Sequence, residues 1–266
     1  MKNLNLMEHH SQAIEKLIAE YENDERFLAT IIGGSVAKGC ARPDSDVDFM
    51  IVAEKSEFEN RKSSGELFIN RTDLCDYPGG FVDGKIVDLS YIEQVAERGN
   101  EPSRAAFDGA FIAYSHIEDL SKLLDMITVY PESNYQHRLK SFYSMAFIQN
   151  WLMGEAERHN NLYTKTRAAS QLALFAGRLI LTHNRVLFPY HKWFIEYIKR
   201  CEEKPLNFLQ QIESLLISPN LANANALFEN LRMYHDWQVT DHQAYLWFMT
   251  EVEQSWILGD TSLEDM

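Results

Sequence analysis

Apolar residues recur at helical spacing near the start of the chain and in short unbroken runs soon afterwards. Between residues 8 and 24 they fall at i, i+3, i+4 and i+7, namely Ile14, Leu17, Ile18 and Tyr21. This spacing predicts an amphipathic helix. The runs FLATII (27–32) and VDFMIV (47–52) are short and strongly apolar, and Gly33-Gly34 ends the first. We expect both runs to form buried strands.

The alternation of helix and strand continues through roughly the first hundred residues. Residues 56–70 are expected to form a helix. The segment FVDGKIVDLSYI (81–92) places an Asp83-Gly84 pair between two strand-like runs, a combination typical of a β-hairpin. A mixture of this kind predicts a small sheet with helices packed on it.

From about residue 115 the pattern becomes helical and almost free of strand signals. Prolines and a His-Asn-Asn break separate the candidate helices, which cover residues 118–127, 134–158, 162–184, 190–201, 206–216, 221–237 and 241–257. We therefore predict an α+β protein with two domains. An N-terminal mixed β-sheet domain covers residues 1–120, and a C-terminal α-helical bundle domain covers residues 121–266.

The charge balance narrows the range of partners. With 25 Lys and Arg against 39 Asp and Glu, the formal net charge is −14, which argues against binding a nucleic-acid backbone. The same charge suits a cationic small substrate or serves solubility alone. No apolar run approaches the roughly 18 residues of a membrane span, and we expect no membrane partner. The N-terminal stretch lacks the apolar core of a signal peptide, and three scattered cysteines indicate reduced thiols, so we expect a cytoplasmic protein.

Two aspartates open the second apolar run. Asp46 and Asp48 flank Val47, and on a strand both carboxylates would point to one face while Val47 points to the other. Two carboxylates on one face repel each other unless a cation lies between them, and magnesium prefers such oxygen ligands together with substrate phosphates. Taken alone, the pair is equally compatible with solvated side chains at a strand end.

A glycine turn precedes this pair. Gly33 and Gly34 end the first strand, and Ser35 can begin a helix whose backbone N–H groups would face an anion. The span from Gly34 to Gly39 also fits the first part of a P-loop. That alternative fails at the next positions, where Cys40-Ala41 replaces Lys and Ser or Thr.

Together, the Gly34-Ser35 turn and the Asp46-x-Asp48 pair resemble the nucleotidyltransferase superfamily that includes DNA polymerase β. The longer stretch GGSVAKGCARPDSDVDFMIV (33–52) is similar to the form found in antibiotic nucleotidyltransferases. The resemblance implies a third carboxylate on a later strand between apolar residues. Asp88 in KIVDLSYI is the candidate, and its simpler interpretation is an edge-strand aspartate.

The resemblance also implies the chemistry. Asp46, Asp48 and Asp88 would bind Mg²⁺, with two ions expected, and a hydroxyl would attack the α-phosphorus of ATP or another nucleoside triphosphate while pyrophosphate leaves. Gly34 and Ser35 would hold the outgoing phosphates. Lys38 and Arg42 would add positive charge there or would serve only solubility.

The helical half resembles lincosamide and aminoglycoside nucleotidyltransferases only in general texture. Members of that subgroup present a lysine from the second domain to the triphosphate, and Lys192 is the candidate; a solvated lysine beside an aromatic core stripe is the alternative. The subgroup implies a small-molecule hydroxyl acceptor and suggests a homodimer. An enzyme that modifies a protein side chain and a non-catalytic nucleotide-binding regulatory module stay open as alternatives.

Overall fold

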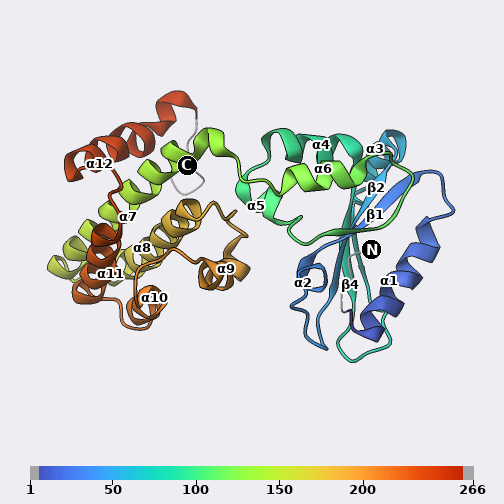
Figure 1. The fold of residues 1–266 in the computed structure, drawn as a ribbon, viewed down its shortest axis with the longest axis horizontal. Helices are drawn as coiled ribbons and strands as arrows, with labels where there is room; N and C mark the ends of the chain where they lie inside the picture. The colour runs from blue at the N-terminus through green and yellow to red at the C-terminus, as the bar shows by residue number, and fades with distance from the viewer. Residues whose placement is uncertain (1–5, 260–266) are drawn as a thin grey trace. The chain divides into compact units, whose positions relative to one another are not determined.

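The computed structural model describes residues 6–259. The chain divides into two compact units, Met1–Val129 and Tyr130–Met266. Figure 1 shows the sheet and its helices in the first unit and the helices of the second. The α+β fold with a mixed sheet followed by helices is therefore confirmed.

The first unit alternates helices and strands in the order α1 (Glu8–Tyr21), β1 (Phe27–Ile32), α2 (Gly34–Ala37), β2 (Val47–Ala53), α3 (Lys55–Ser64), β3 (Phe68–Arg71), β4 (Val82–Asp88), α4 (Leu89–Arg98), α5 (Glu101–Ala105), β5 (Phe111–Ser115) and α6 (Leu120–Ile127). The five strands form one sheet in the order β3-β4-β2-β1-β5. Strands β2 and β4 are parallel, and the other neighbouring pairs are antiparallel.

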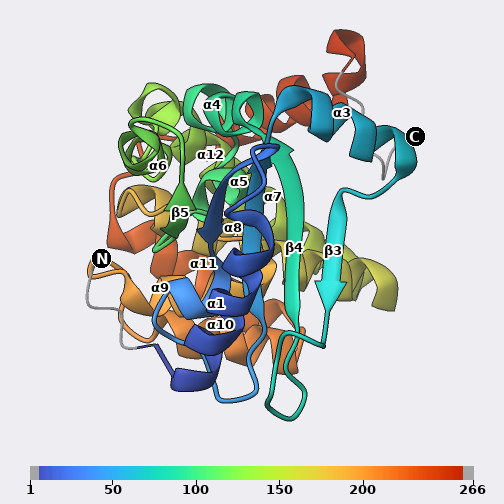
Figure 2. The same ribbon diagram turned by 90° about the vertical axis from the view of Figure 1, so that its right-hand side faces the viewer.

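Both faces of the sheet are covered, as Figures 1 and 2 show. On one face Leu17 of α1 packs with Phe49 and other buried residues of β2. On the other, α4 and α6 cover Met50 and Val52. Because β2 is buried on both sides, its sequence is an apolar run interrupted by an aspartate at one end only.

The predicted hairpin at Asp83-Gly84 is wrong. Both residues lie inside β4, and Gly84 is paired with Phe49 of β2. A Cβ at Gly84 would lie 2.5 Å from the carbonyl oxygen of Phe49 and 2.6 Å from its ring. Glycine is therefore present because a neighbouring ring occupies the space of its side chain, not because the chain turns.

The segment predicted as one helix over residues 56–70 contains two elements. Helix α3 ends at Ser64 and is followed by Gly65 at φ +78°, which allows the left-handed helix stop. The short edge strand β3 then begins at Phe68. Helix α6 was assigned by the sequence to the second domain, but Leu120 and Leu124 pack against the sheet of the first unit.

Among its described residues, the second unit consists of helices and the loops that connect them. Its elements are η1 (Glu132–Asn134), α7 (Tyr135–Arg158), α8 (Leu162–His183), η2 (His191–Trp193), α9 (Phe194–Arg200), α10 (Phe208–Ile217), α11 (Leu221–Tyr234), α12 (Asp241–Phe248), the π-helical turn η3 (Met249–Glu253) and η4 (Ser255–Leu258). They follow the predicted helices closely because apolar periodicity and proline breaks are local signals. Across residues 6–259, the helices are too short or too polar to cross a bilayer.

Candidate active site

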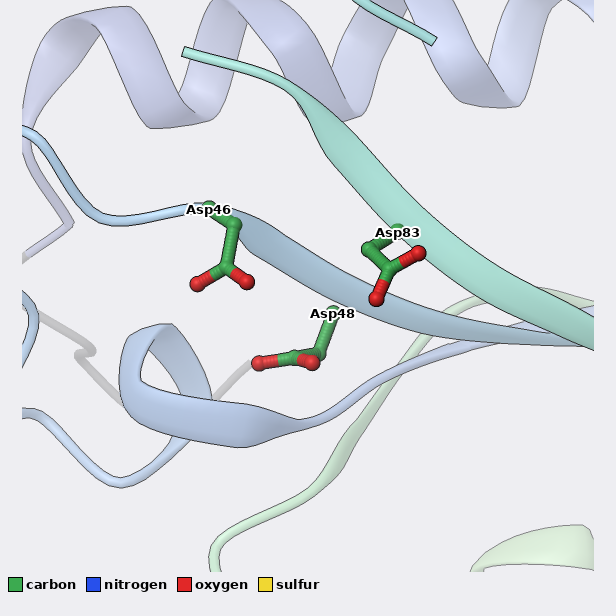
Figure 3. Close-up of side chains that lie close together, drawn as sticks. All are labelled: Asp46, Asp48 and Asp83. Atoms are coloured by element: carbon green, nitrogen blue, oxygen red, sulfur yellow. The ribbon is translucent and has the colours of Figure 1, made fainter. Parts of the chain in front are cut away.

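Three aspartates meet where β2 and β4 begin. Asp46 immediately precedes β2, Asp48 is its second residue, and Asp83 is the second residue of β4. One carboxylate oxygen of each lies within 4.8 Å of those of the other two, and all three side chains are partly exposed. Figure 3 shows the three carboxylates gathered at this end of the parallel pair.

The register of the two strands produces this arrangement. Val47 is paired with Val82, and Asp48 is paired with Asp83. Both valines are fully buried in the core on one face of the sheet, so the aspartates that follow them project to the other face. On the next strand, Asn70 is paired with Asp83 and donates a hydrogen bond from Nδ2 to its Oδ1 at 3.4 Å.

Helix α2 lies directly against Asp48. Gly34 has φ +61°, and a Cβ added to it would lie 1.7 Å from Oδ2 of Asp48. The preceding residue, Gly33, donates its backbone N–H to the carbonyl oxygen of Asp48 at 2.9 Å. Glycine at position 34 thus allows both the backbone conformation and the contact with the carboxylate.

Ser35, the residue after Gly34, carries a buried hydroxyl. Its side chain is only 8% exposed, and its Oγ is buried without a hydrogen-bond partner among the described residues. Its carbonyl oxygen accepts from the N–H of Cys40 at 3.1 Å, which closes the turn after α2. A buried hydroxyl without a partner costs free energy unless a ligand or water satisfies it. The Ser35 hydroxyl is therefore free to hydrogen-bond a ligand or a water molecule.

Comparison with known proteins gives one match to a family model, over about half of the chain. Residues 14–142 match the family model described as “Nucleotidyltransferase domain”. That region contains the glycine turn and all three clustered aspartates of the structure. No curated protein matches the chain.

Solved structures provide a weaker likeness. A nucleotidyltransferase-like protein from Exiguobacterium sibiricum 255-15, solved at 1.90 Å resolution, is 12% identical to this chain. The match covers 91% of this chain and 79% of that one, with a TM-score of 0.49. The similarity to antibiotic nucleotidyltransferases stays a prediction.

Asp88 does not join the cluster of Asp46, Asp48 and Asp83. It ends β4 opposite Ala53, five residues from Asp83, which is roughly 17 Å along a strand. There it is the N-cap of α4, and its Oδ1 accepts from the N–H of Tyr91 at 2.9 Å. The spatial prediction that Asp88 converges with Asp46 and Asp48 is wrong, because the chain uses this carboxylate to begin a helix.

Sequence reasoning missed Asp83 because Asp-Gly was interpreted as a turn. A signal was available: VDF at 47–49 and VDG at 82–84 share a buried valine followed by an aspartate. Alignment of the two short strands on that valine places Asp83 beside Asp48, as the structure does.

Lys38 and Arg42, the two basic residues predicted near the phosphates, differ in burial. The Lys38 side chain is 5% exposed, and its Nζ donates to the carbonyl oxygens of Ala105 at 3.2 Å and Asp108 at 2.9 Å. It therefore ties α2 to the loop after α5. Arg42 is exposed and pairs through Nε with Oδ1 of Asp44 at 3.1 Å.

Lys192 lies outside the nucleotidyltransferase domain match, in the second unit. It is the middle residue of η2, and its Nζ lies 5.7 Å from the centre of the Trp193 ring. This contact matches the aromatic surroundings expected of it. Its role in binding a triphosphate stays a prediction.

Proposed function

We propose that the protein transfers a nucleoside monophosphate, AMP from ATP, to a hydroxyl group of a small molecule with the help of Mg²⁺. The observation that carries the proposal is the convergence of Asp46, Asp48 and Asp83 beside the Gly34-Ser35 turn. The nucleotidyltransferase domain supports nucleotidyl transfer as the reaction class.

The donor set fits magnesium. Three carboxylates from two rigid strands offer hard oxygen ligands with atoms close enough to share an ion. Because Gly34 has no Cβ, the Asp48 carboxylate can lie against it. The Ser35 hydroxyl, which has no partner among the described residues, would donate a hydrogen bond to a phosphate oxygen. Bound magnesium would neutralise the triphosphate and lower the pKa of the attacking hydroxyl. We expect two Mg²⁺ ions at the site.

The chain itself positions the reactants and accepts a proton. The Ser35 hydroxyl and the start of α2 would hold the β- and γ-phosphates, which leaves the α-phosphorus over the aspartates. The acceptor oxygen forms a bond to the α-phosphorus as the bond to the β-phosphate oxygen breaks, and pyrophosphate leaves. The hydroxyl proton passes to a carboxylate oxygen of Asp83. Most of the rate would come from orientation and charge.

The remaining nucleotide ligands belong to the proposal as well. Arg42 can turn from its exposed ion pair with Asp44 toward the phosphates, whereas Lys38 would act from a buried position in which it is paired with Asp108. Lys192 is the proposed triphosphate ligand of the helical unit. GTP or another triphosphate is compatible with the same phosphate contacts.

The acceptor is proposed to be a small molecule of the aminoglycoside or lincosamide kind. The net charge of −14 favours a cationic acceptor over a nucleic acid. Protein adenylylation uses the same chemistry with a different acceptor, and a regulatory nucleotide-binding module would keep the fold without turnover.

Calorimetry and a turnover assay separate these functions. A non-hydrolysable ATP analogue should bind only with Mg²⁺, and Asp46→Asn with Asp48→Asn should abolish that binding. Pyrophosphate release should then appear with one member of a panel of aminoglycosides, lincosamides and sugars. Label transferred to a protein would favour protein adenylylation. Binding that ignores both magnesium and the two substitutions would favour the regulatory module and overturn the proposal.

A further inference from the structure

The carbonyl oxygen of Ser45 receives two side-chain hydrogen bonds from distant parts of the chain. His10 of α1 lies 3.1 Å away through Nε2, and the Tyr77 hydroxyl, from the loop before β4, lies 2.8 Å away. Because a carbonyl only accepts, Nε2 of His10 carries the hydrogen. Two donors therefore converge on the residue that immediately precedes Asp46.

The other polar groups of Ser45 are paired too. Its N–H donates to the carbonyl oxygen of Arg42 at 3.0 Å, and its Oγ accepts from the N–H of Arg42 at 2.9 Å. Backbone groups with this many partners lose most of their freedom to reorient. The carbonyl oxygen of the peptide that joins Ser45 to Asp46 is therefore held by two donors, and Ser45 is also tied to Arg42.

The two donors are themselves fixed by packing. The His10 side chain is 1% exposed, and its ring lies 5.4 Å from that of Tyr77. The His9 ring packs on both, at 4.2 Å from His10 and 4.4 Å from Tyr77. Gly80 makes room for the phenol ring, since a Cβ there would lie 2.6 Å from it. Burial, and then the neighbouring His9, lower the pKa of His10, which favours its neutral form.

Asp46 needs such support more than its two neighbours. Asp48 and Asp83 lie within paired strands, but Asp46 lies one residue before β2 begins. The sheet ladder therefore fixes two of the three carboxylates and leaves the third to the loop that ends at Ser45.

We propose that His10 and Tyr77 are positioning residues that, through the Ser45 carbonyl, hold Asp46 in place for the metal. The inference rests on the proposed function, because it requires a divalent ion at the aspartate cluster. Groups that orient metal ligands from behind commonly matter to metal affinity as well as to stability.

Titration of the full-length protein with Mn²⁺, followed by electron paramagnetic resonance, tests this. The Asp48→Asn variant identifies the signal from the cluster. Tyr77→Phe should raise the Mn²⁺ dissociation constant by about three- to tenfold, the equivalent of one hydrogen bond. The matched control is Tyr114→Phe, which removes a phenol hydroxyl that donates to the carbonyl oxygen of Phe27 at 3.0 Å. It should change the dissociation constant less than about twofold.

A second pair of variants separates positioning from folding. His10→Gln keeps an N–H donor near the place of Nε2 and should retain most of the affinity, whereas His10→Leu should lose as much as Tyr77→Phe. Wild-type affinity in folded Tyr77→Phe and His10→Leu would overturn the inference and leave the proposed function intact. A wild-type protein that binds no Mn²⁺ at the cluster would overturn both.

Discussion

Gly34 and Asp48 lie so close that no side chain fits between them: a Cβ on Gly34 would lie 1.7 Å from Oδ2 of Asp48. The contact joins the glycine turn to the Asp48 carboxylate, which lies on β2 beside residues of the buried core. The sequence separates these residues by a loop, yet in the fold they form one surface.

Gly34→Ala should therefore disable the site. The added methyl group must displace either the Asp48 carboxylate or α2, and a shift of about 1 Å in a reacting group can cost on the order of 100-fold in rate. We expect Mg²⁺-dependent pyrophosphate release to fall by about that factor.

Gly39→Ala is the matched control. Gly39 has φ +67°, close to the φ +61° of Gly34, but no atom of the described residues lies within 4 Å of the added Cβ. Both variants bear a similar backbone strain of about 1 kcal/mol. If Gly39→Ala loses as much activity as Gly34→Ala, backbone strain rather than the contact with Asp48 is responsible.

Asp83→Asn and Asp88→Asn should differ sharply. The first removes a charged oxygen from the cluster and should reduce Mg²⁺-dependent turnover on the order of 100-fold, because metal ions supply several kcal/mol of transition-state stabilisation. The second replaces one good N-cap of α4 by another and should keep turnover within about twofold. Initial rates of pyrophosphate release at saturating nucleotide provide the comparison. Equal losses of turnover in the two variants would indicate that Asp88 does belong to the site.

The comparison of these aspartates shows which parts of the candidate site can be predicted from the sequence. Asp46 and Asp48 could be placed on one face because side chains alternate along any strand, which is a local rule. Asp83 could not be placed with equal ease, because its position depends on the register between two strands far apart in sequence. The burial of Lys38 could not be predicted from the sequence either. The carbonyl oxygens that accept its hydrogen bonds belong to residues 105 and 108, far along the chain.

Ser35→Ala should weaken nucleotide binding without weakening the fold. The hydroxyl has no partner among the described residues, so its removal should change the free energy of unfolding by less than about 0.5 kcal/mol. If it donates to a phosphate, the dissociation constant of the non-hydrolysable ATP analogue should rise by about three- to tenfold. Calorimetry and urea unfolding measure the two quantities. A less stable variant with unchanged nucleotide affinity would assign Ser35 a structural role.

Lys38→Met should act chiefly on stability. Its buried Nζ donates to two carbonyl oxygens, and each hydrogen bond from a charged group contributes about 1.5–3 kcal/mol. We expect the free energy of unfolding to fall by at least about 2 kcal/mol. Arg42→Gln, at an exposed ion pair, should change it by less than about 0.5 kcal/mol. Urea denaturation of both variants checks this, and similar small losses would show that Lys38 is not needed to hold α2.

The stability of the helical unit should fall on mild acidification because of His183. Burial, and then the neighbouring His235, lower the pKa of His183 below its usual 6.5, although Glu203 opposes the shift. The unfolded chain, with the ordinary pKa, therefore binds more protons as the pH falls below about 7, and the free energy of unfolding decreases. The contribution is complete above 6.5 and is lost as the pH falls through the lowered value in the folded state.

His183→Gln should remove this contribution, so the decrease in unfolding free energy between pH 7.5 and 5 should be smaller than in the wild type. His159→Gln is the control, since His159 follows α7 and is largely exposed. Urea unfolding of the three proteins, monitored at several pH values, measures the slopes. Parallel slopes for wild type and His183→Gln would mean that the Glu203 contact at 2.7 Å outweighs burial and keeps the pKa of His183 near its ordinary value.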